Sequence, residues 1–198
     1  MSARLSLFML VFAFCFSGWV HGFLAKKEVK IGKAVPDFEL SDSAGKTVKL
    51  SGFRGSLVMI YFWSARCPYV KRYEERIQKI VSDYQDRGVR VIGIDSNENE
   101  TLEDIQSVIS ERRISYPVLL DDDNKIADQL GAITTPHVFI IDRDGILRYE
   151  GAPDDQGWSE SKVPEKHSAR EALDALLSGS PVEVTETKTF GCTIKRKF

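Results

Sequence analysis

The sequence contains few residues of the kinds that bind metals, phosphates or nucleic acids. It has three cysteines and three histidines among 198 residues, and their spacing does not match a zinc site. The formal net charge is −2, so no excess of basic residues is present to attract nucleic acid. A glycine-rich phosphate-binding loop is also absent. The composition gives no support for a zinc, nucleotide-binding or nucleic-acid-binding protein, and we predict no metal and no cofactor.

The chain also lacks an apolar run long enough to cross a membrane. The almost unbroken apolar stretch from Leu5 to Phe16 falls short of the ~20 residues that a spanning helix needs. It follows Arg4, and Val20-His21-Gly22 resembles a cleavage site. We therefore predict a signal peptide over residues 1–22 and a secreted or periplasmic protein, with no stable membrane insertion after cleavage. The alternative is a membrane anchor. The remainder is predicted to form one domain over residues 23–178 and a C-terminal tail over residues 179–198.

Cysteine is scarce in the predicted mature chain. Cys15 is removed with the signal peptide, which leaves Cys67 and Cys192, an even pair in a compartment that permits disulfides. From the residues alone, this pair is a structural bridge, a redox pair or two independent thiols.

The surroundings of Cys67 favour a reactive thiol. The residue follows a strand-like run, Leu57 to Phe62, and precedes Pro68, a residue suited to the first position of a helix. A helix N-terminus favours the thiolate, the form of cysteine that attacks disulfides and peroxides. The alternative is that Cys67 is a small buried apolar residue.

Strand and helix patterns alternate along the rest of the chain. Helical spacing of apolar residues runs from Pro68 to Tyr84, and again over residues 101–113, 124–130 and 168–177. Strand patterns cover residues 57–62, 89–94 and 117–120, and a hairpin covers 138–142 and 146–150. This order predicts an α/β fold with a mixed sheet covered on both faces. The acidic turn Asp121 to Asn124 lacks the pattern of a calcium loop and is interpreted as the start of a helix.

Three segments resemble the thioredoxin fold: Phe62 to Pro68, Thr134-Thr135-Pro136, and the hairpin around Asp142. The resemblance implies a thioredoxin-like three-layer sandwich with a mixed central sheet and a cis Pro136 that faces Cys67. Within that fold the chain resembles the peroxiredoxin-like redoxins of the alkyl hydroperoxide reductase and thiol-specific antioxidant group. The segments that carry this resemblance are Cys67 to Lys71, Ile94 to Asn97, Thr135-Pro136 and Gly191 to Lys195.

The same resemblance suggests roles for individual residues. Cys67 is the expected attacking thiol and Cys192 a possible resolving thiol, brought back by a mobile tail. Ser64 is expected to align a peroxide, and Thr135, Pro136 and Arg66 are expected to contact substrate.

The sequence also departs from these families. Val70 stands where thioredoxins have a second cysteine, and Ile60 stands where peroxiredoxins have a proline. Ser64 stands where members of the redoxin group often have an additional cysteine. No arginine falls clearly on the catalytic position of peroxiredoxins, for which Arg66 and Arg148 are the candidates.

We therefore expect an exported antioxidant redoxin that reduces peroxides through Cys67. Its alternatives are a thiol-disulfide oxidoreductase without peroxidase activity and a non-catalytic binding redoxin. The expected partners are a peroxide or protein disulfide as substrate and a thioredoxin-like dithiol as reductant. A copper-delivery role through Cys67 and His137 is weak, because such proteins have a cysteine where this chain has Lys71.

Overall fold

A computed structural model describes residues 29–197 of the protein. The predicted signal peptide, residues 1–22, lies outside this range. Within it, no helix combines the length and the apolar character that a membrane-spanning segment requires.

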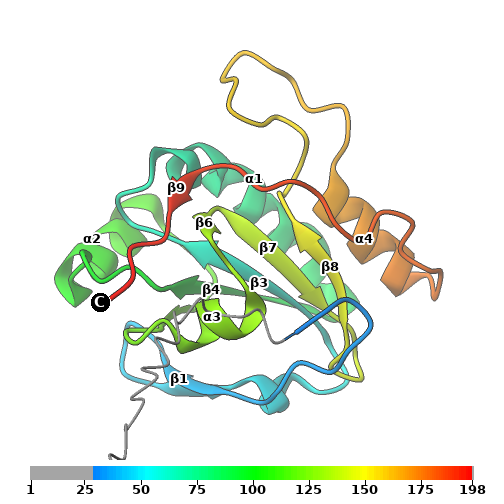
Figure 1. Ribbon diagram of the computed structural model, residues 1–198, viewed down its shortest axis with the longest axis horizontal. Helices are drawn as coiled ribbons and strands as arrows, with labels where there is room; N and C mark the ends of the chain where they lie inside the picture. Colours follow the sequence, from blue (N-terminus) through cyan, green and yellow to red (C-terminus); the bar gives the residue numbers. More distant parts are fainter. Residues whose placement is uncertain (1–28, 198) are drawn as a thin grey trace, which may run out of the picture.

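A five-stranded mixed sheet forms the centre of the molecule (Figure 1). Its strands lie in the order β5-β4-β3-β7-β8. Strands β3, β4 and β5 are parallel, and β7 is antiparallel to both β3 and β8. Their bounds are β3 Leu57–Trp63, β4 Val89–Asp95, β5 Val118–Leu120, β7 His137–Ile141 and β8 Leu147–Gly151. Because β3 and β4 are parallel neighbours, their carboxyl ends lie at the same edge of the sheet, with Trp63 opposite Asp95.

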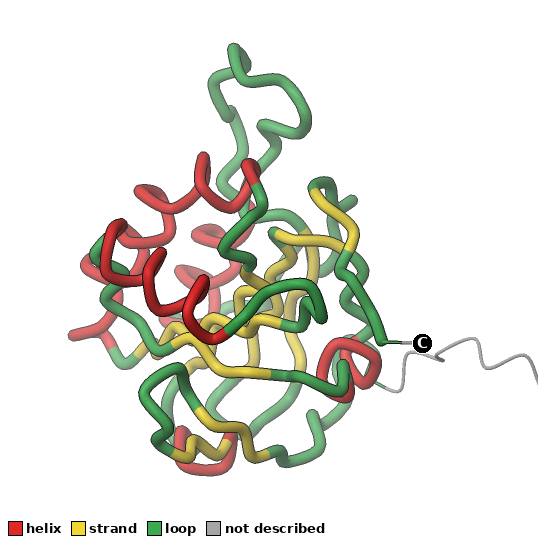
Figure 2. The backbone as a smooth tube through the Cα atoms, turned by 90° about the vertical axis from the view of Figure 1, so that its left-hand side faces the viewer, coloured by secondary structure: helices red, strands yellow, loops and turns green. Residues whose placement is uncertain are grey.

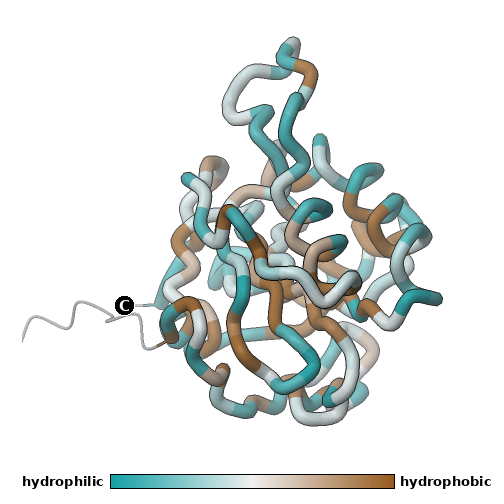
Figure 3. Tube along the Cα trace, turned by 90° about the vertical axis from the view of Figure 1, so that its right-hand side faces the viewer, coloured by the Kyte–Doolittle hydropathy of each residue, from teal (hydrophilic) through white to brown (hydrophobic). Residues whose placement is uncertain are grey.

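Helices cover both faces of this sheet (Figure 2). Alternate side chains of β3 point to opposite faces, so Met59 and Tyr61 belong to one apolar core and Ile60 and Phe62 to another. The first core includes residues of α1 (Pro68–Tyr84), α2 (Leu102–Arg112) and α4 (Ser168–Leu177). The second includes residues of α3 (Lys125–Leu130) and the segment before β3. The apolar parts of the chain accordingly gather around the central strands (Figure 3). This arrangement confirms the predicted mixed sheet with helices on both faces.

Shorter elements complete the fold. Strands β1 (Glu39–Ser41) and β2 (Thr47–Lys49) form an antiparallel pair, and the 3-10 helices η1 (Leu50–Phe53) and η2 (Gln85–Arg87) precede β3 and β4. Local chemistry explains the helix starts: Thr101 and Asp104 form the predicted capping box at α2. The carboxylate of Asp121 accepts the N–H groups of Ile126 and Ala127 at the start of α3. The acidic turn therefore forms the start of helix α3, as predicted.

The C-terminal tail returns to the edge of the central sheet. Residues Cys192–Thr193 form strand β9, which pairs with β6 (Thr134–Thr135) in a second small sheet. In Figure 1 the tail runs from α4 across the top of the molecule to β6. The sequence did not indicate this pairing, because it joins two very short segments, and strands of two residues carry no periodic signal.

Candidate active site

Cys67 lies at the junction between the central strand β3 and helix α1. It is the N-cap residue of α1, and Pro68 occupies the first turn as predicted. Its side chain is 2% exposed, and its Sγ donates a hydrogen bond to the Thr135 carbonyl at 3.1 Å. The peptide bond between Thr135 and Pro136 is cis, as the resemblance implied. The Cys67 thiol thus lies at the N-terminus of a 17-residue helix and at the edge of the sheet, the position that reactive cysteines occupy.

The tail places the second cysteine directly against the first. Thr135 and Cys192 are antiparallel strand partners, and the two sulfur atoms are 2.8 Å apart as free thiols. Gly191 permits this approach: its φ is +135°, and a Cβ there would lie 2.1 Å from the Thr135 carbonyl oxygen. Only glycine meets both conditions without strain. Cys192 is half-buried, whereas Cys67 is buried.

Contacts on the C-terminal side of Cys192 hold the tail in place. Ile194 is buried, and its N–H donates to the Ile133 carbonyl at 3.1 Å. The Lys195 N–H donates to Asn97 Oδ1 at 3.0 Å. Arg196 Nε donates to Asp128 Oδ1 at 2.8 Å. The tail therefore contacts the β4–α2 loop, α3 and the segment before β6.

Aromatic side chains hold the tail on the other side of Cys192. Phe190 is buried against Tyr69, whose ring centroid is 6.2 Å away, and against Tyr73 at 5.8 Å. Trp158 comes from the loop between β8 and α4 and lies edge-on to Tyr69 at 5.1 Å. Phe190 belongs to the same apolar core as Cys67, and Tyr69 and Cys192 pack against that core.

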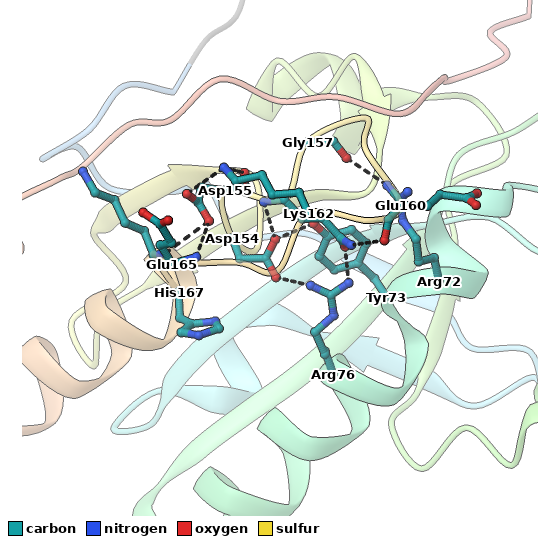
Figure 4. Close-up of polar contacts among 12 residues, drawn as sticks. Arg72, Tyr73, Arg76, Asp154, Asp155, Gly157, Glu160, Lys162, Glu165 and His167 are labelled. Atoms are coloured by element: carbon teal, nitrogen blue, oxygen red, sulfur yellow. Dashed lines mark hydrogen bonds and ion pairs between the residues drawn. The ribbon is translucent and has the colours of Figure 1, made fainter.

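The loop that carries Trp158 projects from the body of the protein (Figure 1), and polar contacts with helix α1 anchor it (Figure 4). Asp154 is 5% exposed and accepts hydrogen bonds from Tyr73 Oη and Arg76 Nη1, both at 2.5 Å. Arg72 donates to the Gly157 carbonyl at 2.8 Å. Burial and the Asp154 carboxylate raise the pKa of Tyr73, which keeps its hydroxyl protonated as a donor. Helix α1 thereby fixes the loop beside the candidate site.

Ser64 and Glu100 shape the loop between β3 and Cys67. Ser64 is buried, and its hydroxyl accepts the Cys67 N–H at 3.1 Å and donates to the Glu100 carboxylate. Glu100 also accepts the N–H groups of Ala65 at 2.6 Å and Arg66 at 3.2 Å. The Ser64 hydroxyl is thus engaged by the protein itself in this structure.

Sequence reasoning did not identify Glu100 as a residue of the site. One signal was available: Glu100 follows the carboxyl end of β4, and carboxyl ends of neighbouring parallel strands share one edge of the sheet. The 36 positions that separate Ser64 from Glu100 conceal the contact in the sequence.

Two groups at the site have strongly raised pKa values. Burial, with the Glu100 carboxylate beside it, raises the pKa of Asp95 to about 9, so Asp95 is protonated at neutral pH. Burial and the hydrogen bond with Cys67 raise the pKa of Cys192 to about 12. Cys192 is therefore a thiol at neutral pH.

The two candidate arginines pair with acidic residues, and His137 packs against an aromatic ring. Arg66 is beside Cys67 in the chain, but its guanidinium pairs with Asp104 at 2.8 Å. Arg148 lies on β8 and pairs with Asp142 at 2.6 Å, on the hairpin rather than at the cysteine pair. His137 is buried on β7 and packs against Phe139, with ring centroids 4.3 Å apart. Within residues 29–197, no three histidine, cysteine or acidic side chains are grouped to hold a metal ion.

A small cavity of about 160 Å³ opens beside the two sulfur atoms. Its lining includes both cysteines, Glu100, Asn99 and Lys195. Asn99 and Lys195 are exposed, so the cavity connects the sulfur pair with solvent on the side of the tail.

Comparison with known proteins agrees with this geometry. The model of the AhpC/TSA family matches residues 31–150. The thiol-disulfide oxidoreductase ResA of Bacillus cereus is 28% identical over 145 residues, which cover 70% of this chain and 83% of the relative. A hypothetical protein from Sinorhizobium meliloti has a TM-score of 0.79 and 32% identity, covering 85% of this chain and 96% of its own. A Chlorobium tepidum structure described as a thiol:disulfide interchange protein DsbE shares the fold, with a TM-score of 0.60 and 22% identity over 76% of this chain and 97% of its own. The expected thioredoxin-like architecture is thereby confirmed.

Proposed function

This chain belongs to the AhpC/TSA family and is an oxidoreductase, and on that premise we propose that it exchanges thiols and disulfides through Cys67 and Cys192. The observation that carries the proposal is the 2.8 Å separation of the two sulfur atoms. Only a small movement is needed to join them in a disulfide, whose S–S bond is about 2.05 Å long. The pair then cycles between two thiols and one disulfide.

The two thiols have different parts in oxidation. Cys67 is the nucleophile, because it lies at a helix N-terminus, where reactive cysteines are found, whereas the raised pKa of Cys192, about 12, keeps Cys192 a thiol. Cys67 attacks a substrate disulfide and forms a mixed disulfide, which releases one substrate thiolate. Cys192 then attacks the Cys67 sulfur, releases the second substrate thiolate and leaves the Cys67–Cys192 disulfide. Val70 occupies the position of the thioredoxin second cysteine, and Cys192 takes over that role from the tail.

We propose protein disulfides as substrates, since the ResA relative is a thiol-disulfide oxidoreductase. A thioredoxin-like dithiol is proposed as the reductant that restores the two thiols. We also propose export by a signal peptide over residues 1–22, because disulfide chemistry belongs to oxidising compartments.

Disulfide exchange is favoured over the peroxide reduction that we first expected. In peroxide reduction, the Ser64 hydroxyl would align the peroxide. In this structure the same hydroxyl accepts the Cys67 N–H and donates to the Glu100 carboxylate. The two arginines considered for peroxide activation pair with Asp104 and Asp142 instead.

The test compares reduction of a model protein disulfide, oxidised insulin, with consumption of hydrogen peroxide, each supplied with dithiothreitol. We expect the wild type to accelerate insulin reduction and Cys67→Ser to lose that acceleration. Peroxide consumption by the wild type should not exceed that of free cysteine at equal thiol concentration. Fast peroxide consumption without insulin reduction would overturn the proposal in favour of a peroxidase.

The Ser64→Ala and Ser64→Thr variants distinguish a role of Ser64 in supporting the loop from a role in aligning peroxide. If Ser64 supports the loop, Ser64→Ala slows insulin reduction and Ser64→Thr, which keeps the hydroxyl, restores it. If Ser64 aligns peroxide, Ser64→Ala affects peroxide consumption alone, which contradicts the structural role.

A further inference from the structure

We propose that the loop between β8 and α4, residues 152–167, is a docking surface for the polypeptide substrate, with Trp158 as its main contact. The occupant is an extended peptide segment that carries an aromatic side chain and a carboxylate next to its disulfide. This inference rests on the proposed function and adds what distinguishes one protein disulfide from another. The two cysteines perform the exchange, and the loop supplies affinity.

The cavity at the sulfur pair is too small to hold more than the reacting part of a substrate. Its volume is about 160 Å³, whereas pockets that enclose small ligands measure about 300–1,000 Å³. Cys67 is also only 2% exposed. The affinity for a substrate therefore has to come from surface outside this cavity.

An apolar surface extends from the first turn of α1 to the loop. The exposed Pro68 and the half-buried Tyr69 directly follow Cys67. The ring of Trp158 lies edge-on to that of Tyr69 at 5.1 Å and is 60% exposed. In Figure 1 the loop and strand β9 both lie at the upper end of the molecule. Exposed tryptophan is typical of the few residues that supply most of the affinity at protein interfaces.

Polar contacts fix the conformation of the loop in the free protein (Figure 4). Arg76 donates hydrogen bonds to Asp154 and Gln156, both of which are buried. Arg72 donates to the Gly157 carbonyl at 2.8 Å. A surface that is already ordered loses little conformational entropy when a partner binds. Trp158 is therefore presented to a substrate in a fixed position.

The charge beside this surface favours an acidic partner. The Arg72 guanidinium lies 5.0 Å from the centroid of the Tyr69 ring and donates to the Trp158 carbonyl at 3.4 Å. Within residues 29–197, no carboxylate forms an ion pair with Arg72 or with the exposed Lys71. Two positive charges without a carboxylate partner thus adjoin the aromatic rings. A carboxylate next to the aromatic side chain of the substrate complements them.

The experiment follows single turnovers of the reduced mature chain with three disulfides. Two are disulfide-linked peptide dimers, one with Glu and Phe beside the cysteine and one with Ala at both places. The third is hydroxyethyl disulfide, which is too small to span the distance to the loop. Each turnover joins the two protein thiols in a disulfide and releases two substrate thiols. Acid quenching and mass spectrometry give the limiting rate and the half-saturating concentration, which should be at least about tenfold lower for the Glu–Phe peptide than for the Ala peptide.

Trp158→Ala should raise the half-saturating concentration of the Glu–Phe peptide at least about tenfold, the change expected for truncation of a main interface contact. The limiting rate and the reaction with hydroxyethyl disulfide should keep their wild-type values, because the sulfur pair is unchanged. Trp158→Phe retains a ring and should restore most of the affinity. Val184→Ala, which truncates another exposed apolar side chain, is the matched control and should have no effect.

Lys71→Gln tests the preference for a carboxylate. It should raise the half-saturating concentration of the Glu–Phe peptide about two- to fivefold and leave that of the Ala peptide unchanged. Lys79→Gln, which changes an exposed lysine further along α1, is the control. Equal effects of Lys71→Gln on both peptides would contradict the acidic character of the partner.

The other outcomes separate the docking role from its alternatives. Equal half-saturating concentrations in the wild type and Trp158→Ala overturn the inference but leave the proposed function intact. A slower reaction of Trp158→Ala with hydroxyethyl disulfide would instead assign the ring to support of the sulfur pair. A wild-type dimer in sedimentation that Trp158→Ala converts to a monomer would make this surface a contact between two copies of the chain. Failure of the wild type to react with any of the three disulfides defeats the proposed function itself.

Discussion

Thr135 and Cys192 are antiparallel strand partners, and this pairing places the Cys192 sulfur against that of Cys67. Thr135 contributes in two ways, since its carbonyl also accepts the hydrogen bond of the Cys67 thiol. The residue before the cis proline thus positions both cysteines of the candidate site. The second cysteine comes from the far end of the chain rather than from helix α1.

Gly191→Ala should detach the tail from the site. The φ of +135° and the close Thr135 carbonyl both oppose a side chain, at a cost of about 1–3 kcal/mol for the strained backbone. Such a cost corresponds to about a 5- to 150-fold loss of docked tail. We expect faster alkylation of Cys67 by iodoacetamide and slower formation of the Cys67–Cys192 disulfide.

Gly179→Ala is the matched control for that substitution. Gly179 also has a positive φ, +75°, but nothing lies within 4 Å of a Cβ added there. It should leave the alkylation rate of Cys67 unchanged. Equal alkylation rates for both variants would show that contact between Gly191 and Thr135 does not control docking of the tail.

Asp95→Asn should change how stability depends on pH. The folded protein raises the pKa of Asp95 to about 9, well above that of an unfolded aspartate, through burial and the neighbouring Glu100. Above about pH 4 the folded state therefore keeps a proton on Asp95 that the unfolded state loses. The contribution of Asp95 to the free energy of unfolding is complete below about pH 4 and is lost as pH rises toward 9. The free energy of unfolding of the wild type should fall by at most about 1.4 kcal/mol per pH unit from this cause.

Urea unfolding at pH 5, 7 and 9 measures this effect. The stability of Asp95→Asn relative to the wild type should increase from pH 5 to pH 9, because asparagine does not titrate. Asp122→Asn, which changes an exposed aspartate, should keep a constant difference from the wild type. A constant difference for Asp95→Asn as well would mean that Asp95 does not retain its proton in the folded protein.

Asp154→Ala should destabilise the loop that carries Trp158. The substitution leaves Tyr73 and Arg76 without their shared acceptor, and an unsatisfied buried polar group costs about 1–3 kcal/mol. Glu160→Ala changes an exposed side chain of the same loop, for which an effect within about 0.5 kcal/mol is expected. We expect a lower urea midpoint and faster proteolysis within residues 155–166 for Asp154→Ala alone. Equal effects of the two substitutions would contradict the anchoring role of Asp154.

The sequence predicted the parts of this molecule that have a local cause. The strand before Cys67, the proline at the start of α1 and the Thr101 capping box each follow from neighbouring residues. The cis state of Pro136 was expected only from family resemblance, because spacing alone gives an X–Pro bond a small probability of being cis.

Long-range contacts were harder to predict. Glu100 meets Ser64 because β3 and β4 end at the same edge, which becomes visible only once the strand order is known. The tail carries no pattern that reveals its pairing with Thr134–Thr135, although Gly191 next to Cys192 is consistent with close backbone approach. Resemblance named Cys192 as a candidate, and the tertiary structure places it beside Cys67.

The most direct test of the account is whether Cys67 and Cys192 form a disulfide in the mature protein. The reduced wild type is treated with one equivalent of a disulfide oxidant, labelled with a thiol reagent and analysed by peptide mass spectrometry, with Cys192→Ser alongside. The account predicts that the wild type loses both labelled thiols and yields a peptide pair joined through Cys67 and Cys192, whereas Cys192→Ser retains a mixed disulfide at Cys67. A wild type that accumulates the mixed disulfide at Cys67 while Cys192 remains a free thiol would contradict it.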